Sequence, residues 1–201
     1  MKKNHAIVSV KLMLLLALAG CGKESGTNDG PNSAPSAPSN ETSQPTAEPT
    51  EKPDGGDHVV DYKLDIPEDF AEVELEGVTK CWFRASDNSN INMLVSDKVT
   101  GTDVSFQLIS ADLLRETVVE QMKQSYGAEP TITERYFTKE KVSGLDAYQY
   151  SYDMDLDGTQ MSQIIVCINA DQTYTFTYTT SDADTLAVFD ASAKNIQLTL
   201  G

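Results

Sequence analysis

The chain has 201 residues, 39% of them hydrophobic, and carries 31 acidic against 15 basic side chains, a formal net charge of −16. Nucleic acid and anionic lipid repel so acidic a protein, which excludes binding to either through charge. The only histidines, His5 and His58, precede the apolar strand patterns. Ser-His-Asp or Cys-His nucleophile pairs and His-based zinc sites are therefore excluded from the predicted core.

Residues 1–20 have the three parts of an export signal. Lys2 and Lys3 give a positive start, and the apolar run 12–19 is shorter than the roughly 20 residues that a membrane-spanning helix needs. Leu18-Ala19-Gly20-Cys21 then resembles the lipobox of bacterial lipoproteins. The resemblance implies cleavage between Gly20 and Cys21, a diacylglyceryl group on Cys21, and attachment to the extracytoplasmic face of the cell membrane. An ordinary secretory signal with a chance cysteine is the alternative.

Residues 21–57 are predicted to be the lipidated cysteine followed by a disordered linker. Six of the eight prolines fall in it, and Val, Ile, Leu, Phe, Tyr and Trp are absent from 22–57. Such a segment buries too little apolar surface to offset its ordering entropy. Fully extended at ~3.1 Å per residue, it would reach about 110 Å from the lipid surface.

Residues 58–201 are predicted to form a single globular domain, with 10 basic and 24 acidic side chains and so a net charge of −14. Alternating or apolar runs predict strands at 61–66, 79–85, 91–96 and 104–108. Leu114, Val118 and Met122 then recur every four residues, between Ser110 as N-cap and Gly127 as terminator. They predict an amphipathic helix over 111–126.

The second half is rich in strands. Apolar patterns predict strands at 132–137, 145–154, 160–168 and 173–179. A second helix should start at an N-cap Ser181, with Asp184 in a capping box and Leu186, Phe189 and Ile196 on its inner face, and a short strand should follow at 198–200. This order predicts an α+β fold, in which two helices cover an antiparallel sheet of about six to eight strands.

Three segments resemble Mog1/PsbP-like domains. They are Tyr62-Lys63-Leu64-Asp65-Ile66-Pro67-Glu68-Asp69-Phe70, then Val142-Ser143-Gly144-Leu145-Asp146-Ala147-Tyr148-Gln149-Tyr150, and Thr173-Tyr174-Thr175-Phe176-Thr177-Tyr178 before a helix. The resemblance covers about residues 58–200 and implies an α/β/α sandwich that acts by binding or assembly, without catalysis. Phe70 departs from the pattern, because many members have Trp there. Members serve unrelated systems, so the fold leaves the function open.

Two cysteines remain besides Cys21. Cys81 and Cys167 lie in apolar strand-like runs, where a free thiol packs as a small hydrophobe. An extracytoplasmic location also permits a disulfide between them. The sequence leaves both alternatives open.

The acidic run Asp153, Asp155 and Asp157 before Gly158 matches the start of a calcium loop. Its twelfth position is Ile164 instead of a bidentate glutamate, and its flanks are strand-like. The pattern equally predicts a β-hairpin with a tight Asp157-Gly158 turn. Ca²⁺ is the one metal ion that the sequence suggests, and no other cofactor is expected.

Tyr148, Tyr150 and Tyr152 fall on one face of the predicted strand, and we expect Tyr174, Phe176 and Tyr178 to lie near them. Such rings usually fill a core or stabilise a sheet. An exposed platform of tyrosines would instead stack on cell-wall sugars.

These patterns predict a membrane-anchored, extracytoplasmic lipoprotein that is not an enzyme and that binds or assembles with an unknown extracytoplasmic protein, but not nucleic acid. The alternatives are a lipoprotein binding a small ligand, a cell-wall glycan or calcium, and a hydrolase that depends on carboxylates alone. The hydrolase would require a buried acid pair in a cleft.

Overall fold

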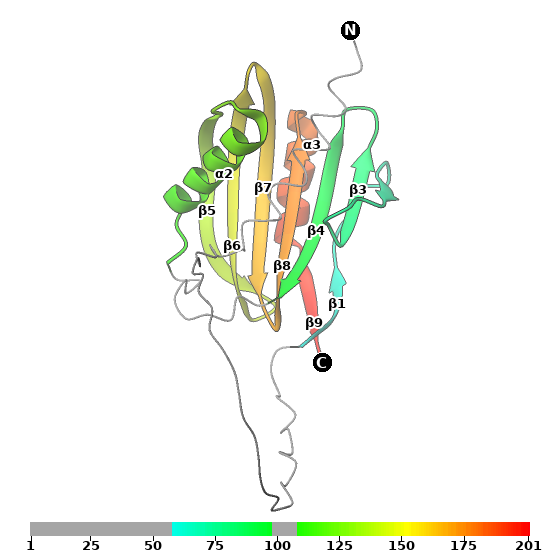
Figure 1. Cartoon of the computed structure of the whole chain (residues 1–201). Coiled ribbons are helices and arrows are strands. Elements are labelled where there is room, and N and C mark those ends of the chain that lie inside the picture. Colours follow the sequence, from blue (N-terminus) through cyan, green and yellow to red (C-terminus); the bar gives the residue numbers. More distant parts are fainter. Residues whose placement is uncertain (1–57, 98–107) are drawn as a thin grey trace, which may run out of the picture.

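The computed structural model describes residues 58–97 and 108–201, so the predicted strand 104–108 falls almost wholly outside it. Nine strands and two helices follow one another along this part of the chain (Figure 1). They are β1 (Val59–Lys63), β2 (Ala71–Val73), β3 (Lys80–Arg84), β4 (Ser89–Asp97), α2 (Ala111–Tyr126), β5 (Thr131–Val142), β6 (Leu145–Leu156), β7 (Thr159–Asn169), β8 (Gln172–Thr180), α3 (Ala183–Lys194) and β9 (Gln197–Leu200). No described helix has the length and apolarity to cross a membrane.

Seven strands form one antiparallel sheet in the order β2-β3-β4-β8-β7-β6-β5. Strands β5 to β8 are consecutive hairpins, whereas β4 joins them by pairing with β8, so that Ile91 lies opposite Tyr178. A separate two-stranded sheet pairs β1 with β9. Two helices and this arrangement confirm the predicted α+β sandwich.

Two hairpin turns in the sheet need residues that tolerate positive φ. Ser143-Gly144 joins β5 to β6 with φ of 51° and 85°, and Asp157-Gly158 joins β6 to β7 with φ of 52° and 81°. Two-residue turns of this kind match the twist of the flanking strands, and glycine adopts them without a steric penalty. The hairpin that the sequence predicted at Asp157-Gly158 is confirmed.

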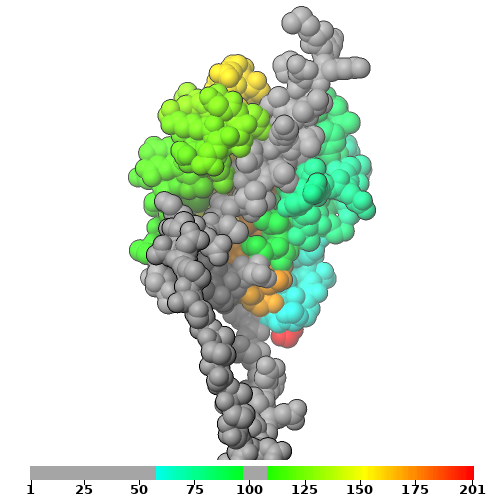
Figure 2. Space-filling view, viewed as in Figure 1, coloured from blue at the N-terminus to red at the C-terminus, as the bar shows by residue number. Residues whose placement is uncertain are grey.

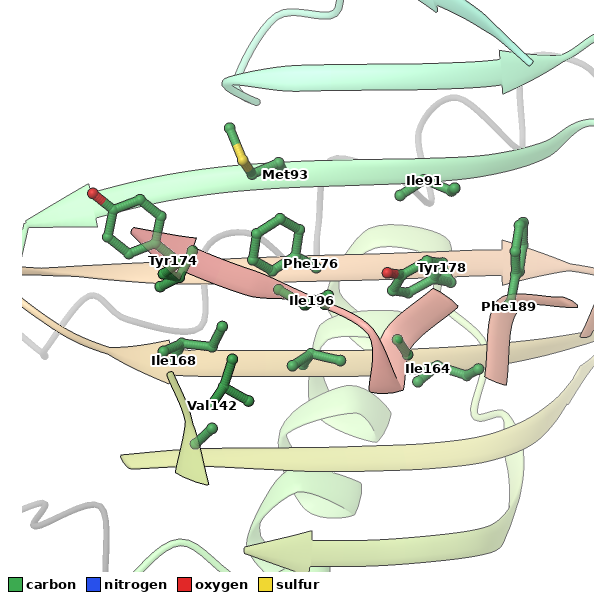
Figure 3. Close-up of a cluster of buried hydrophobic side chains, with 14 of the residues drawn as sticks. Ile91, Met93, Val142, Ile164, Ile168, Tyr174, Phe176, Tyr178, Phe189 and Ile196 are labelled. Carbon is green, nitrogen blue, oxygen red and sulfur yellow. The ribbon is translucent and has the colours of Figure 1, made fainter. Parts of the chain in front are cut away.

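One face of the large sheet packs under α3, β1 and β9. Figure 3 shows Ile91 and Met93 of β4, Phe176 and Tyr178 of β8 and Phe189 of α3 converging on this side. Phe189 is fully buried, and its ring centroid lies 5.7 Å from that of Phe70 and 5.3 Å from that of Tyr178. Apolar side chains of β3 to β8 thus form one continuous cluster on the α3 face.

The opposite face packs under α2. Val118 and Met122 of the helix contact a second buried cluster from β6 and β7, which includes Tyr148, Ile165 and Cys167. Partly buried side chains of β5 complete this cluster. Helix α2 therefore covers the β5–β6–β7 part of the sheet, as the position of its ribbon in Figure 1 also shows.

The ends of α2 agree with the sequence. The Ser110 side chain accepts from the Leu113 amide, and Gly127 adopts the left-handed conformation with φ of 68°. Those two caps satisfy amide and carbonyl groups that a helix end leaves unpaired. The predicted helix over 111–126 is confirmed at both ends.

The start of α3 was predicted wrongly by one residue. Asp182, not Ser181, is the N-cap, because its carboxylate accepts from both the amide and the hydroxyl of Thr185. The pairing predicted between Ser181 and Asp184 therefore does not form. Ile196 lies beyond the helix, which ends at Lys194, although its side chain is buried.

Two further predictions differ at the N-terminal side. The first strand spans 59–63, not 61–66; Leu64 and Ile66 follow it and still pack against the α3-face core. Strand β2 was missed, because all three of its residues are exposed and give no periodic signal.

Candidate functional site

The three aspartates of the calcium-like run lie at the β6–β7 hairpin. Asp155 Oδ1 accepts from the Gly158 amide at 2.9 Å, and Asp153 Oδ1 accepts from the Ser162 hydroxyl at 2.6 Å. The carboxylates of Asp153 and Asp155 thus stabilise the turn and the strand pairs next to it. In the part of the chain that the structure describes, no three His, Cys, Asp or Glu residues are grouped as a metal site requires. Calcium binding by Asp153, Asp155 and Asp157 stays a prediction for calorimetry.

The tyrosines of β6 belong to the core under α2. Tyr148, Tyr150 and Tyr152 have exposed fractions of 8%, 0% and 0%. The rings of Tyr150 and Tyr152 lie 5.1 Å apart, and Phe137 of β5 packs against Tyr150 edge-on. Burial raises the pKa of all three hydroxyls. No ring face of this set is exposed for stacking on a sugar.

The expected neighbours of these tyrosines lie elsewhere. Tyr174, Phe176 and Tyr178 are on β8, which β7 separates from β6, and they face α3 instead of α2. The expectation of one shared aromatic face is therefore wrong. Both sets follow a period of two, and that period does not reveal which side of the sheet each set faces.

The two cysteines of the domain are buried free thiols. Cys81 lies on β3 and Cys167 on β7, with β4 and β8 between them. Three strand spacings of about 4.8 Å are too far for a disulfide. Burial raises the pKa of Cys81 to about 11 and also raises that of Cys167. Cys21 and Gly20, which the sequence marks for lipidation and cleavage, lie outside the described residues.

Beyond the area under α2, the same face of the sheet turns polar. Asn90 and Asn92 of β4, Gln163 of β7, and Thr177 and Thr179 of β8 are all buried there, with exposed fractions of 8% or less. Gln163 Nε2 donates to Thr179 Oγ1 at 2.9 Å, and Asn92 Nδ2 donates to Asn90 Oδ1 at 3.1 Å. We call these five residues the polar half-face; none of them carries a charge.

Three buried oxygens on the α2 side have no hydrogen-bond partner: Asn92 Oδ1, Gln121 Oε1 on α2 and the Tyr150 hydroxyl. Among the described residues, no such atom occurs on the α3 side. Buried polar atoms are nearly always paired, and unpaired ones often mark a place where water or a ligand binds. The sequence gives no sign of this array, because Asn and Thr in a strand usually predict an exposed face.

Arg84 organises one end of the α3 face. Its guanidinium donates to both carboxylate oxygens of Asp87, at 3.0 and 2.6 Å, and to Asp69 at 3.0 Å. It also donates to Thr185 of α3 and lies 5.1 Å from the ring centroid of Phe70. Hydrogen bonds from Arg84, with others from Ser89, lower the pKa of Asp87 to about 2. Through these hydrogen bonds Arg84 links the β3–β4 turn to α3. The sequence analysis did not predict this cluster.

A hollow opens at the edge of the sheet beside β2. Residues 71–80, which we call the β2 margin, comprise β2, the connecting loop and the first residue of β3. They line an open cavity of about 630 Å³, bordered by Glu72, Glu74, Glu76, Val73, Leu75, Val78, Thr79 and Lys80. In Figure 2, α2 lies at the left of the view, and the region of β2, β3 and β4 lies at the right.

Within the β2 margin, the positive charge of Lys80 is paired with the negative charge of Glu72. The Lys80 ammonium donates to the Glu72 carboxylate, which raises the pKa of Lys80. Glu74 and Glu76 are exposed, as is Val73, with 39% of its surface accessible. No described strand pairs with the outer edge of β2. The margin therefore combines open backbone, apolar side chains and negative charge.

The arrangement as a whole defines an α+β sandwich with one helix on each face of the sheet. No protein-family model matches the chain, and no curated protein is significantly similar to it. Among solved structures, the chain is similar to the solution structure of cyanobacterial PsbP (CyanoP) from Synechocystis sp. PCC 6803. The TM-score is 0.55 at 14% identity, covering 74% of this chain and 89% of that one. The fold is PsbP-like, as the sequence motifs implied.

A looser similarity links the chain to the crystal structure of LpqN, a protein involved in cell envelope biogenesis of Mycobacterium tuberculosis. Here the TM-score is 0.46 at 13% identity, over 69% of this chain and 83% of that one. That score is too low to establish a shared fold.

Proposed function

We propose that the chain is a lipid-anchored, extracytoplasmic module that binds another protein and catalyses no reaction itself. The anchor rests on the sequence of residues 1–21, in which charge, apolar run and lipobox follow in order. The binding role rests on the β2 margin, where an edge that no described strand pairs with adjoins an open cavity of about 630 Å³. A cavity beside an unpaired edge gives a partner both a shape and backbone groups to recognise.

The chemistry of the described core agrees with a role in binding. None of its Asp or Glu side chains is buried. Asp87, Asp171 and Asp182 have pKa values below their usual range because of hydrogen bonds to their carboxylates. A general acid needs the opposite shift, toward neutrality. The acid pair that the hydrolase alternative requires is thus lacking in residues 58–97 and 108–201.

The anchor is tested by Cys21→Ala. We expect the variant to leave the membrane fraction of intact cells, because the diacylglyceryl group supplies the two acyl chains needed for stable attachment. The matched control is Cys167→Ala, which removes a buried thiol and should leave the protein with the membrane. Persistence of the Cys21→Ala protein on membranes would contradict the lipid anchor.

The binding role is tested by photocrosslinking in intact cells. A photoreactive phenylalanine analogue is placed at Val73 in the β2 margin and, as a control, at Val188 on the outer side of α3. Both valines are exposed, at 39% and 49%. One recurrent adduct from position 73 that is missing from position 188 is the expected result. Equal adducts from both positions, or none, would refute a partner at this margin.

Binding of a small uncharged ligand is the second candidate function. The observation that favours it is the polar half-face, with Asn92 Oδ1 buried and unpaired. N-acetylglucosamine disaccharide, as a probe of cell-wall glycan, should then raise the melting temperature of the protein but not that of Asn92→Leu. An identical response of both proteins would remove this candidate.

A further inference from the structure

The two edges of the seven-stranded sheet differ in how they are protected. Edge strand β5 is 12 residues long, and its pairing with β6 is interrupted by a bulge between Glu134 and Tyr136. Lys139 and Lys141 are exposed along it. Bulges and lysines on an edge oppose the addition of another strand. Strand β5 therefore carries two devices against pairing.

The opposite edge, β2, has neither device. Its residues Ala71, Glu72 and Val73 pair with β3 in unbroken register, and none of them is a lysine. Three residues are too few to template aggregation, since a very short edge strand is itself protective. They are enough to start the docking of a short extended segment, provided that neighbouring groups extend the contact.

The rest of the β2 margin supplies such an extension. Leu75 and Val78 are partly buried in the loop, and with Val73 they offer apolar contacts along the cavity. Glu74 and Glu76 alternate with them and are exposed. The alternation along this stretch of chain suits a ligand whose side chains also alternate, which is the property of a β-strand.

The negative charge of the β2 margin determines which kind of partner segment can bind there. The cavity is lined by three carboxylates and one ammonium group, and the ammonium group of Lys80 is already paired with Glu72. The domain around it carries 24 acidic against 10 basic side chains. Acidic or phosphorylated partners are repelled from such a surface, whereas cationic ones are attracted and oriented by it.

We propose that the β2 margin binds an extended, cationic segment of the partner protein by adding it to the edge of β2. Its backbone pairs with the free edge, apolar side chains enter the cavity beside Val73 and Leu75, and Lys or Arg side chains meet Glu74 and Glu76. This inference rests on the proposed binding function and specifies the chemistry of the partner.

The test uses the purified Cys21→Ala chain and a fluorescent heptapeptide of alternating lysine and valine. Fluorescence anisotropy should show binding in dilute salt that weakens as salt is raised, because exposed charges are screened. A peptide of the same composition with its lysines and valines in two blocks should bind at least about tenfold more weakly, since it cannot alternate along an edge.

Charge reversal locates the site. The double variant Glu74→Lys/Glu76→Lys should bind the alternating peptide at least about tenfold more weakly. Glu134→Lys/Glu140→Lys on edge strand β5 changes the net charge equally and should match the parent protein. All four glutamates are exposed, so every replacement is made at the surface. Unchanged thermal unfolding of the variants shows that the fold is intact.

Equal affinity for the two peptides, or equal losses in the two double variants, would overturn the inference and indicate non-specific charge attraction. A position-specific adduct at Val73 with no peptide binding would refute the cationic segment but leave the proposed partner in place. Failure of both experiments would remove the binding function as well.

Discussion

The two faces of the central sheet are built from the same strands but differ in chemistry. On the α3 face, apolar side chains extend from Trp82 of β3 to Ala147 of β6, and the buried polar residues Gln149 and Ser151 lie farther along β6. On the α2 face, the strands of the apolar cluster are β5, β6 and β7, and the polar half-face lies on β4, β8 and Gln163 of β7. A strand in the centre of a sheet thus does not need two apolar faces.

The difference follows from the strand sequences. Strands β6 and β7 are buried on both sides over most of their length. In β7 large apolar residues occupy successive positions, whereas in β6 Tyr148, Tyr150 and Tyr152 alternate with smaller or polar buried residues. Strands β4 and β8 alternate between apolar and polar residues. Ile91, Met93, Phe176 and Tyr178 lie on the α3 face, while the Asn and Thr residues lie on the opposite face, beyond the part that α2 covers. The stability of the domain should therefore depend more on the α3 face, and the following experiments test this asymmetry.

Phe189→Ala should have the largest effect. Phe189 is fully buried between Phe70 and Tyr178, and removing the ring leaves a cavity in the larger cluster. We expect the free energy of unfolding, measured in urea, to fall by about 3–5 kcal/mol. Val188→Ala, which changes the exposed neighbour on the same helix, should cost no more than about 0.5 kcal/mol.

Met122→Ala removes the fully buried side chain with which α2 packs on the sheet. We expect a smaller loss of about 2–3 kcal/mol, because alanine is the better helix former and this cluster covers only part of the sheet. Leu113→Ala, at an exposed position of α2, is the matched control. A loss as large as that of Phe189→Ala would abolish the asymmetry.

Asp87→Asn tests the polar end of the α3 face through pH. The pKa of Asp87 is lowered from 3.8 to about 2 in the folded protein, first by Arg84 and then by Ser89. The resulting stabilisation, about 2 kcal/mol at ~1.4 kcal/mol per pKa unit, is complete above about pH 4 and is lost as pH falls toward 2.

The Asp87→Asn protein should therefore be less stable at pH 7 and should lose less stability between pH 4 and 2, so that the two curves converge in acid. Thermal unfolding across pH measures this. Asp157→Asn is the control: this residue lies in an exposed turn with positive φ, which asparagine also tolerates. Its stability should follow that of the parent protein at every pH. Parallel curves for Asp87→Asn would show that Arg84 does not hold that carboxylate.

Gln163→Leu tests the polar half-face. Gln163 accepts from the buried Tyr152 hydroxyl and donates to Thr179 Oγ1, so leucine leaves both without their partner. The expected loss is about 1–3 kcal/mol by chemical denaturation. Asn92→Leu should cost less than about 1 kcal/mol, because it loses one hydrogen bond but also removes an unpaired oxygen. A greater loss at Asn92 would contradict this hydrogen-bond pattern.

The thiols should give the smallest effect. Cys81 and Cys167 are 1% and 6% exposed, and burial raises both pKa values. In the Cys21→Ala chain, a thiol reagent should modify neither of them until denaturant is added, when both should react. Mass spectrometry should find the same mass with and without reductant. A two-dalton difference would show a disulfide and contradict the separation of β3 from β7.

Local features were predicted well from the sequence because neighbouring residues decide them. Ser110 and Gly127 set the ends of α2, and Asp157-Gly158 sets a hairpin turn, each through backbone groups a few residues away. Where two neighbouring residues could serve, the prediction failed by one position, as at Ser181 and Asp182. The site was harder, because the exposed β2 residues follow no periodic pattern.

The sequence by itself determined the class of fold, most of the secondary structure, the acidic charge and the lack of histidine in the core. Only the tertiary structure decided that β4 pairs with β8, that the two sets of aromatic residues face opposite sides, and that Arg84 reaches α3. These contacts join residues far apart in the chain. A period of two assigns side chains to one face or the other, but the order of strands depends on how all the faces pack together.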